Sequence, residues 1–142
     1  MMMIVCLTFF EAGSFYRLPA FSVKELRELG FIYLSESFNN QSKEINFAAF
    51  VDTQIVGIVG LQKNPYDKTN YWFMFVTILE QFKGKGIGSQ LVRAAIEYAI
   101  ADNCTINISS YSSEGLQRVR PVVIALDKKY PNKIFEQDYR FI

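Results

Sequence analysis

Runs of apolar residues alternate with polar turns along this chain of 142 residues. Short runs that are rich in β-branched and aromatic residues predict strands, because such side chains pack well on a pleated surface. The run Tyr71–Leu79 is apolar almost throughout, which is typical of a strand in the centre of a sheet. The predicted strands are Ile4–Phe10, Ile45–Val51, Ile55–Leu61, Tyr71–Leu79, Cys104–Ser109 and Lys133–Ile142.

Apolar residues at helical spacing predict helices between these strands. The first begins at Ser22, which can form a capping box with Glu25, and it continues through Ser37 as one helix or as two divided at Gly30. A second helix, Ile87–Ile100, carries a continuous apolar stripe. The turn Asp52-Thr53-Gln54 between the second and third strands predicts a hairpin.

A third helical pattern runs from Leu116 to Tyr130, and Pro131 ends it. Because Pro121 fits near a helix N-terminus, residues 114–120 are interpreted as a loop or a short first turn. The order is then strand, one or two helices, three strands, helix, strand, helix and strand, which predicts an α/β sandwich with a mixed sheet. At this length we expect residues 1–142 to form a single domain with its own core.

The amino-acid composition excludes several classes of function. Hydrophobic residues make up 50% of the chain and the formal net charge is +1, which argues against disorder and against a nucleic-acid partner. The chain has no histidine, which excludes imidazole bases, His-dependent triads and His-ligated metals, and we expect no metal ion.

The cysteines and the N-terminal segment bear on location. Cys6 and Cys104 lie in apolar runs without metal-ligand spacing and are interpreted as buried free thiols, which favours a reducing, cytoplasmic setting. Residues 1–10 are apolar, but they lack the basic start and cleavage site of a signal peptide and are too short to span a membrane. We therefore expect no membrane partner.

The candidate chemistry lies in segment 80–92, between the run Tyr71–Leu79 and the helix that begins at Ile87. This segment reads as a strand, a glycine-rich turn and a helix, and that order presents free N–H groups and the positive end of a helix dipole to an anion. Glycines at alternate positions let the backbone approach a bulky ligand closely. The turn contains Gly84, Gly86 and Gly88, and two lysines, Lys83 and Lys85, which add positive charge or are ordinary surface lysines. The pattern predicts a phosphate-bearing ligand.

The spacing of the glycines excludes two common phosphate loops, the Walker loop and the dinucleotide fingerprint. The run instead resembles the acetyl-CoA pyrophosphate loop of the GNAT superfamily of N-acetyltransferases, whose signature is Gln/Arg-x-x-Gly-x-Gly/Ala after the fourth strand. The register Gln81-x-x-Gly84-x-Gly86 satisfies the letters. We prefer Lys83-x-x-Gly86-x-Gly88, in which Lys83 departs from Gln/Arg. The order of elements is also that of the GNAT fold, so the resemblance spans essentially the whole chain.

The resemblance implies a mixed, mostly antiparallel central sheet that is flanked by helices and splays between its fourth and fifth strands. Acetyl-CoA, the cosubstrate, would lie in this splay. Its pantetheine would pair with the backbone of the fourth strand and its pyrophosphate would rest on the N–H groups of the loop. The implied cofactor-binding residues are Val76, Thr77, Ile78, Lys83, Gly84, Lys85, Gly86, Ile87, Gly88 and Ser89.

The resemblance also implies transfer of the acetyl group to a primary amine, and here the chain departs from the family. Many members use a glutamate on the fourth strand as base, but no acidic residue lies between Asn70 and Leu79, and Glu80 is interpreted as a solvated charge. The tyrosine that many members use as thiolate acid is replaced by Asp127. A water chain would serve as base, or none would be needed for an amine of low pKa.

Two tyrosines are the candidate proton donors to the departing thiolate. Tyr111 is preferred because it follows the fifth strand where the splay opens, and Tyr130 is the second candidate. Each has a structural alternative, an aromatic loop residue for Tyr111 and a packing residue for Tyr130. Arg118 and Arg120 would bind an acceptor carboxylate or form a solvated basic edge.

Three functional hypotheses follow. The first is an acetyl-CoA-dependent N-acetyltransferase that acts on a small amine, an amino acid, a protein terminus or a lysine. The second is a catalytically silent GNAT-fold module that binds acyl-CoA, and the third is a nucleotide-binding or interaction domain whose glycine turn is coincidental. The apolar ends of Lys133–Ile142 would permit a homodimer.

Overall fold

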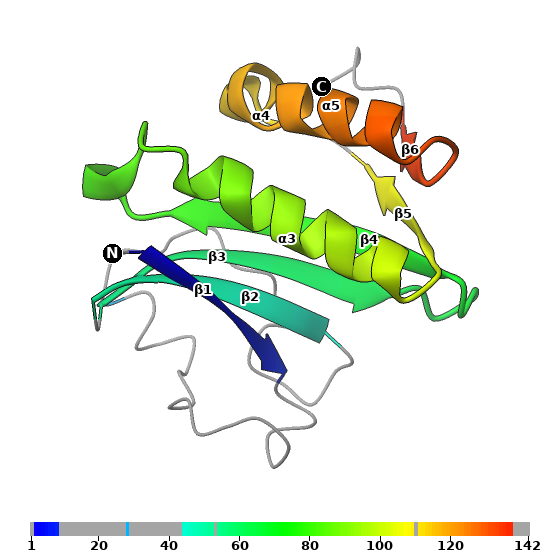
Figure 1. Cartoon of the computed structure of the whole chain (residues 1–142), viewed down its shortest axis with the longest axis horizontal. Coiled ribbons are helices and arrows are strands. Elements are labelled where there is room, and N and C mark those ends of the chain that lie inside the picture. The colour runs from blue at the N-terminus through cyan, green and yellow to red at the C-terminus, as the bar shows by residue number, and fades with distance from the viewer. Residues whose placement is uncertain (1, 9–27, 29–43, 53, 110, 138–142) are drawn as a thin grey trace.

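The computed structural model of the chain describes residues 2–8, 28, 44–52, 54–109 and 111–137. Within these residues the strands form one sheet in chain order, with α-helices packed on it (Figure 1). The strands are β1 (Met2–Thr8), β2 (Glu44–Val51), β3 (Gln54–Lys63), β4 (Asn70–Ile78), β5 (Thr105–Ile108) and β6 (Ile134–Glu136).

The sheet is mixed, as predicted. The pairs β1–β2, β2–β3 and β3–β4 are antiparallel, whereas β5 runs parallel to β4 and β6 runs parallel to β5. The predicted hairpin is confirmed, because Val51 pairs with Gln54 and Asp52 adopts a positive φ of 55°. The parallel strands each follow a helical connection, which is what a parallel pairing requires.

The helices α3 (Ile87–Ala101) and α5 (Arg120–Lys129) share one hydrophobic core with the sheet. The apolar stripe predicted for α3 is confirmed, since its members on the sheet side are buried: Ile87, Leu91, Val92, Ala95, Ile96 and Ala99. Figure 1 shows α3 lying across β3 and β4. Gly57 on β3 allows this close approach, because a Cβ there would lie 2.7 Å from Cδ1 of Ile78 and 2.9 Å from Cδ1 of Leu91.

The third helical pattern divides into two helices, α4 (Ser113–Arg118) and α5, which meet at Val119. Pro121 explains the division, because it has no N–H to donate and its ring crowds the preceding turn. The predicted short first turn is thus a helix in its own right. It begins before Leu116, since the side chain of Ser112 caps it by accepting a hydrogen bond from the N–H of Gly115.

The ends of the chain can be compared only in part with the prediction. The predicted helical segment 22–37 lies outside the described residues except for Glu28, which is helical. Of the predicted last strand, Lys133–Ile142, the described residues form β6 at Ile134–Glu136, and residues 138–142 lie outside the described part. Among the described residues, no helix has the length and apolar character needed to cross a membrane.

Candidate functional site

Strands β4 and β5 separate after a short stretch of pairing, which confirms the predicted splay between the fourth and fifth strands. β5 pairs with β4 only along Asn70–Phe73. On the opposite edge of β4 the register with β3 shifts, since Gly60 pairs with Phe75 and Leu61 with Phe73, so that Met74 is an extra residue. The later part of β4, Val76–Ile78, keeps its pairing with β3 but has no β5 partner.

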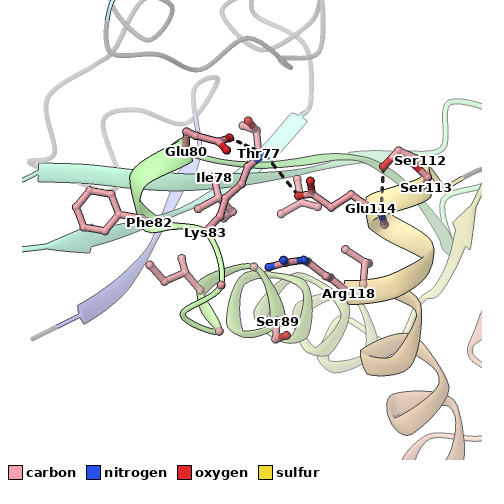
Figure 2. Close-up of a pocket in the computed structure, with 17 residues that line it drawn as sticks. Thr77, Ile78, Glu80, Phe82, Lys83, Ser89, Ser112, Ser113, Glu114 and Arg118 are labelled. Atoms are coloured by element: carbon pink, nitrogen blue, oxygen red, sulfur yellow. Dashed lines mark hydrogen bonds and ion pairs between the residues drawn. The ribbon is translucent and has the colours of Figure 1, made fainter.

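A cavity of about 740 Å³ occupies the space that this separation opens. One wall is the end of β4 with the following η1 turn (Glu80–Phe82) and glycine loop, and the other wall is α4 (Figure 2). Its lining consists of Val76, Thr77, Ile78, Glu80, Phe82, Lys83, Gly84, Gly86, Ile87, Gly88, Ser89, Ser112, Ser113, Glu114, Gly115, Arg118 and Val119. The structure therefore brings together every predicted cofactor residue except Lys85.

The glycine loop has the backbone geometry that its sequence predicts. Gly84 and Gly86 have φ values of +80° and +81°, in the left-handed region that a Cβ disfavours. Gly86 is the N-cap of α3, and the first N–H groups of that helix have no partner within the helix. The first turn of α3 contains no acidic residue, so this end of the helix dipole favours an anion in the cavity.

The two loop lysines are placed differently. Lys83 lines the cavity, but its N–H donates to the carbonyl of Glu80, and its Nζ lies 3.1 Å from Glu80 Oε2 and 3.6 Å from Glu114 Oε1. The hydrogen bond to Glu80, with the charge of Glu114, raises the pKa of Lys83. Lys85 is exposed outside the lining, with its Nζ 5.7 Å from the centre of the Phe82 ring. Lys83 thus connects the loop to α4, as Figure 2 shows.

Most residues of the α4 wall were not predicted as part of the site, and only Arg118 was, as a ligand of an acceptor carboxylate. Ser112, Ser113, Glu114 and Gly115 form the capped start of the helix, and Arg118 lies one turn further along. The sequence carries one signal for this wall, a serine N-cap followed by an acidic residue in the first turn. That signal gives the helix start but not its position opposite the glycine loop, which depends on the divergence of β5 from β4.

Neither candidate tyrosine lines the cavity. Tyr111 is 5% exposed and its hydroxyl donates to Oε2 of Glu136 at 2.6 Å. It lies directly behind the α4 wall, since a Cβ on Gly115 would lie 3.6 Å from Cβ and Cδ1 of Tyr111. The hydroxyl of Tyr130, at the end of α5, donates to Oε2 of Glu97 on α3 at 3.0 Å.

The remaining predicted residues fall on either side of the cavity's boundary. Arg118 lines the cavity, whereas the Nε of Arg120 lies 3.1 Å from Glu136 Oε2.

Cys104 is a buried free thiol, as predicted, while the side chain of Cys6 lies outside the described part. In the described residues no cluster of histidine, cysteine or carboxylate side chains could hold a metal ion.

The comparisons with known proteins agree with this architecture. The model of the acetyltransferase (GNAT) family matches residues 12–116, and the chain therefore belongs to that family. Among curated proteins none matches the chain.

Solved structures that are similar to this chain include several acetyltransferases. IAA acetyltransferase from Bacillus cereus ATCC 14579 has 20% identity and a TM-score of 0.57, and the match covers 91% of this chain and 75% of that one. Aminoglycoside acetyltransferase meta-AAC0020 from an uncultured soil metagenomic sample, in complex with trehalose, has 16% identity and a TM-score of 0.51, with 99% and 94% covered. A Bacillus anthracis str. Ames protein proposed to be a streptothricin acetyltransferase, in complex with acetyl coenzyme A, has 25% identity and a TM-score of 0.41 over 47% of this chain and 38% of that one, so this chain matches less than half of its length.

Proposed function

We propose that residues 1–142 form one acetyltransferase domain that transfers an acetyl group from acetyl-CoA directly to a primary amine. The observation that carries this proposal is the cavity between the unpaired edge of β4 and α4, which ends at the glycine loop and the start of α3. A free strand edge suits an amide-bearing arm, and free N–H groups at a helix start suit a diphosphate. The cofactor combines both features in one elongated molecule.

In this arrangement the pantetheine arm lies along Val76–Ile78 and pairs with their backbone. The diphosphate is held by the backbone around Gly84 and Gly86 and by the first turn of α3, Ile87–Ser89. Lys83 lines this part of the cavity with its charge paired to Glu80 and Glu114, and Lys85 adds positive charge from outside the lining. No metal ion is needed for this chemistry, because the thioester is already an activated acyl group.

The reaction is an attack of the neutral amine nitrogen on the thioester carbonyl carbon. A C–N bond forms, the C–S bond breaks, the nitrogen loses a proton and the thiolate of CoA gains one. The ammonium form of the acceptor loses its first proton to water, since β4 carries no carboxylate between Asn70 and Ile78. We assign the proton donor for the thiolate to Tyr111, with Tyr130 as the second candidate.

Tyr111 is preferred to Tyr130 as the proton donor because it lies closer to the cavity. Tyr111 lies directly behind Gly115, which lines the cavity, whereas the hydroxyl of Tyr130 is bonded to Glu97 of α3. Tyr111→Phe is therefore expected to lower kcat about 100-fold, within the usual range for a general acid. Tyr130→Phe, which tests the second candidate, is expected to leave kcat near the parent's value. If both variants keep the parent's turnover number, neither tyrosine is the acid.

A second candidate function, a catalytically silent module that binds acyl-CoA, has one observation in its favour. Both phenols donate to carboxylates in this structure, Tyr111 to Glu136 and Tyr130 to Glu97, and neither lines the cavity. The two functions predict the same binding and differ only in turnover.

The first test is calorimetric titration of the purified chain with acetyl-CoA, with Gly86→Glu as the variant. A carboxylate at position 86 faces the anion and is also strained at a φ of +81°, so binding should be lost. A thermal melt of the variant checks that it is folded. If the parent binds, a panel of amines assayed for release of free CoA thiol separates the enzyme from the silent module. If the parent does not bind acetyl-CoA, both functions are excluded.

A further inference from the structure

The cavity contains one cationic side chain that the glycine loop does not supply, Arg118 of α4. Its Nη1 lies 3.8 Å from the point that a Cβ on Gly84 would occupy, so the guanidinium lies over the glycine loop. Figure 2 shows the side chain extending from α4 toward the start of α3. An anion held by the first N–H groups of α3 would lie between that helix end and this guanidinium.

The charges around the cavity single out Arg118. The lining carries two carboxylates, Glu80 and Glu114, and both lie within ion-pair distance of Lys83. Among the described residues no carboxylate pairs with Arg118. The two carboxylates therefore neutralise the positive charge of Lys83. In the described lining, the guanidinium of Arg118 is the positive charge that remains available to a ligand.

We propose that Arg118 binds the diphosphate of the acyl-CoA from the α4 side, opposite the glycine loop. This inference rests on the proposed function and assigns to the cofactor a residue that the sequence pattern linked to the acceptor. A guanidinium presents two parallel N–H donors that match two oxygens of a diphosphate, which a lysine cannot do. The diphosphate would then be held by backbone N–H groups on one side and by a planar fork on the other.

The Lys83–Glu114 ion pair has a defined role in this arrangement. Glu114 precedes Arg118 by one helical turn, the spacing at which a carboxylate pairs with an arginine on the same helix. Because Glu114 is held by Lys83 at 3.6 Å, Arg118 remains available to the ligand. Lys83→Gln should release Glu114 toward Arg118 and weaken binding, and Lys83→Gln with Glu114→Gln should restore much of the lost affinity.

The test is calorimetric binding of three ligands to the parent, to Arg118→Ala and to Arg118→Lys. Acetyl-CoA has the diphosphate and a 3′-phosphate, acetyl-dephospho-CoA keeps only the diphosphate, and acetyl-pantetheine has neither. Arg93→Ala, an exposed position on α3 outside the lining, is the control for loss of one positive charge. Thermal melts check that each variant is folded.

We expect Arg118→Ala to bind acetyl-CoA and acetyl-dephospho-CoA about tenfold more weakly, the lower end of what a hydrogen-bonded charge contributes, because the site is open to solvent. Its affinity for acetyl-pantetheine should match that of the parent, and Arg118→Lys should recover only part of the loss. The proposal would be overturned by no loss of affinity or by an equal loss for all three ligands. It would also be overturned by a loss confined to acetyl-CoA, because that result would assign Arg118 to the 3′-phosphate. Failure of the proposed function appears separately, as a parent that binds none of the three.

Discussion

Two neighbouring glycines before and within α3 differ in what a side chain would cost. Gly86 has a φ of +81° and open space where a Cβ would lie, so the effect of Gly86→Ala comes from its backbone alone. At Gly88, in the first turn of α3, a Cβ would make an ordinary contact 3.7 Å from Cγ1 of Ile78. Glycine is therefore favoured at position 86 by the positive φ, whereas the backbone at position 88 accepts a residue with a side chain.

This difference gives a prediction about stability without ligand. Gly86→Ala should lower the free energy of unfolding by about 1–2 kcal/mol, the cost of a left-handed conformation. Gly88→Ala should leave it unchanged or raise it by up to about 1 kcal/mol, because alanine favours a helix more than glycine does. Urea denaturation of both variants measures the two effects, and equal destabilisation would show that the loop has another conformation.

A polar cluster at the far end of α3 stabilises the start of β4. The hydroxyl of Tyr71, which is buried, donates to Oδ2 of Asp102 at 2.7 Å, and Nζ of Lys63 lies 3.1 Å from the same oxygen. The hydrogen bond from Tyr71, followed by Lys63, lowers the pKa of Asp102 below its usual value. Burial, followed by the hydrogen bond to Asp102, raises the pKa of Tyr71.

The sign of the pH dependence follows from these directions. Since folding depresses the pKa of Asp102, the stabilisation is present above the ordinary pKa of 3.8 and is lost as the pH falls from there toward the folded-state value. Tyr71→Phe should lower the free energy of unfolding by about 1 kcal/mol near neutral pH. This value is low for a hydrogen bond to a charged group because the side chain of Asp102 is half exposed. The difference between parent and variant should narrow below about pH 4 in urea titrations. A difference independent of pH would mean that the hydroxyl does not stabilise the ionised carboxylate.

At the scale of elements, the packing of α3 on β3 depends on the missing side chain of Gly57. The Cδ1 atoms of Ile78 and Leu91 would lie 2.7 Å and 2.9 Å from a Cβ at this position, closer than side chains pack. Gly57→Ala should therefore destabilise the chain by about 1–3 kcal/mol, the usual cost of overpacking. Adding Leu91→Ala removes one of the two contacts but leaves Ile78 in place.

The measurement is a denaturation series on both single variants and the double variant. Because the two residues contact each other, their effects should not add, and the double variant should be more stable than the sum of the single changes predicts. Strict additivity would show that α3 shifts away from the sheet without cost.

The elements that the sequence predicted well are those whose pattern is local. The glycine turn and the stripe of α3 follow directly from spacing, and the strand at Ile45–Val51 is observed at Glu44–Val51. The start of α4 was missed because its apolar pattern begins at Leu116, while the cap that begins the helix is Ser112. A capping hydrogen bond of one serine is a weaker signal than a repeated apolar spacing.

The composition of the site could be predicted only on one side. The wall formed by β4 and the glycine loop is continuous in sequence, so Val76 and Gly86 could be placed together. The wall that contains Ser112 and Arg118 is opposite this loop only because β5 leaves β4 after Phe73. Such a divergence depends on contacts between distant residues, and no short pattern encodes it.

At the scale of the whole molecule, the splay divides the described sheet into two parts with few connections. One part contains β1–β4 with α3, and the other contains β5 and β6 with α4 and α5. They are joined by the pairing of Asn70–Phe73 with β5 and by the core between α3 and α5. The cavity lies where these connections are absent, and residues of both parts line it.

Acetyl-CoA in this cavity should therefore couple the two parts. A ligand that binds only the folded chain stabilises it by about 2.7 kcal/mol at 100 times its Kd. Because the proposed site includes Ile78 and the glycine loop on one wall and Ser112 and Arg118 on the other, the amides of α4 and β5 should exchange more slowly with the ligand bound. Hydrogen exchange followed by mass spectrometry, with and without acetyl-CoA, measures this protection. Strand β1, which pairs with β2 and has no residue in the described lining, serves as the internal reference. Protection confined to the glycine loop and the first turn of α3 would mean that the cofactor contacts one wall alone.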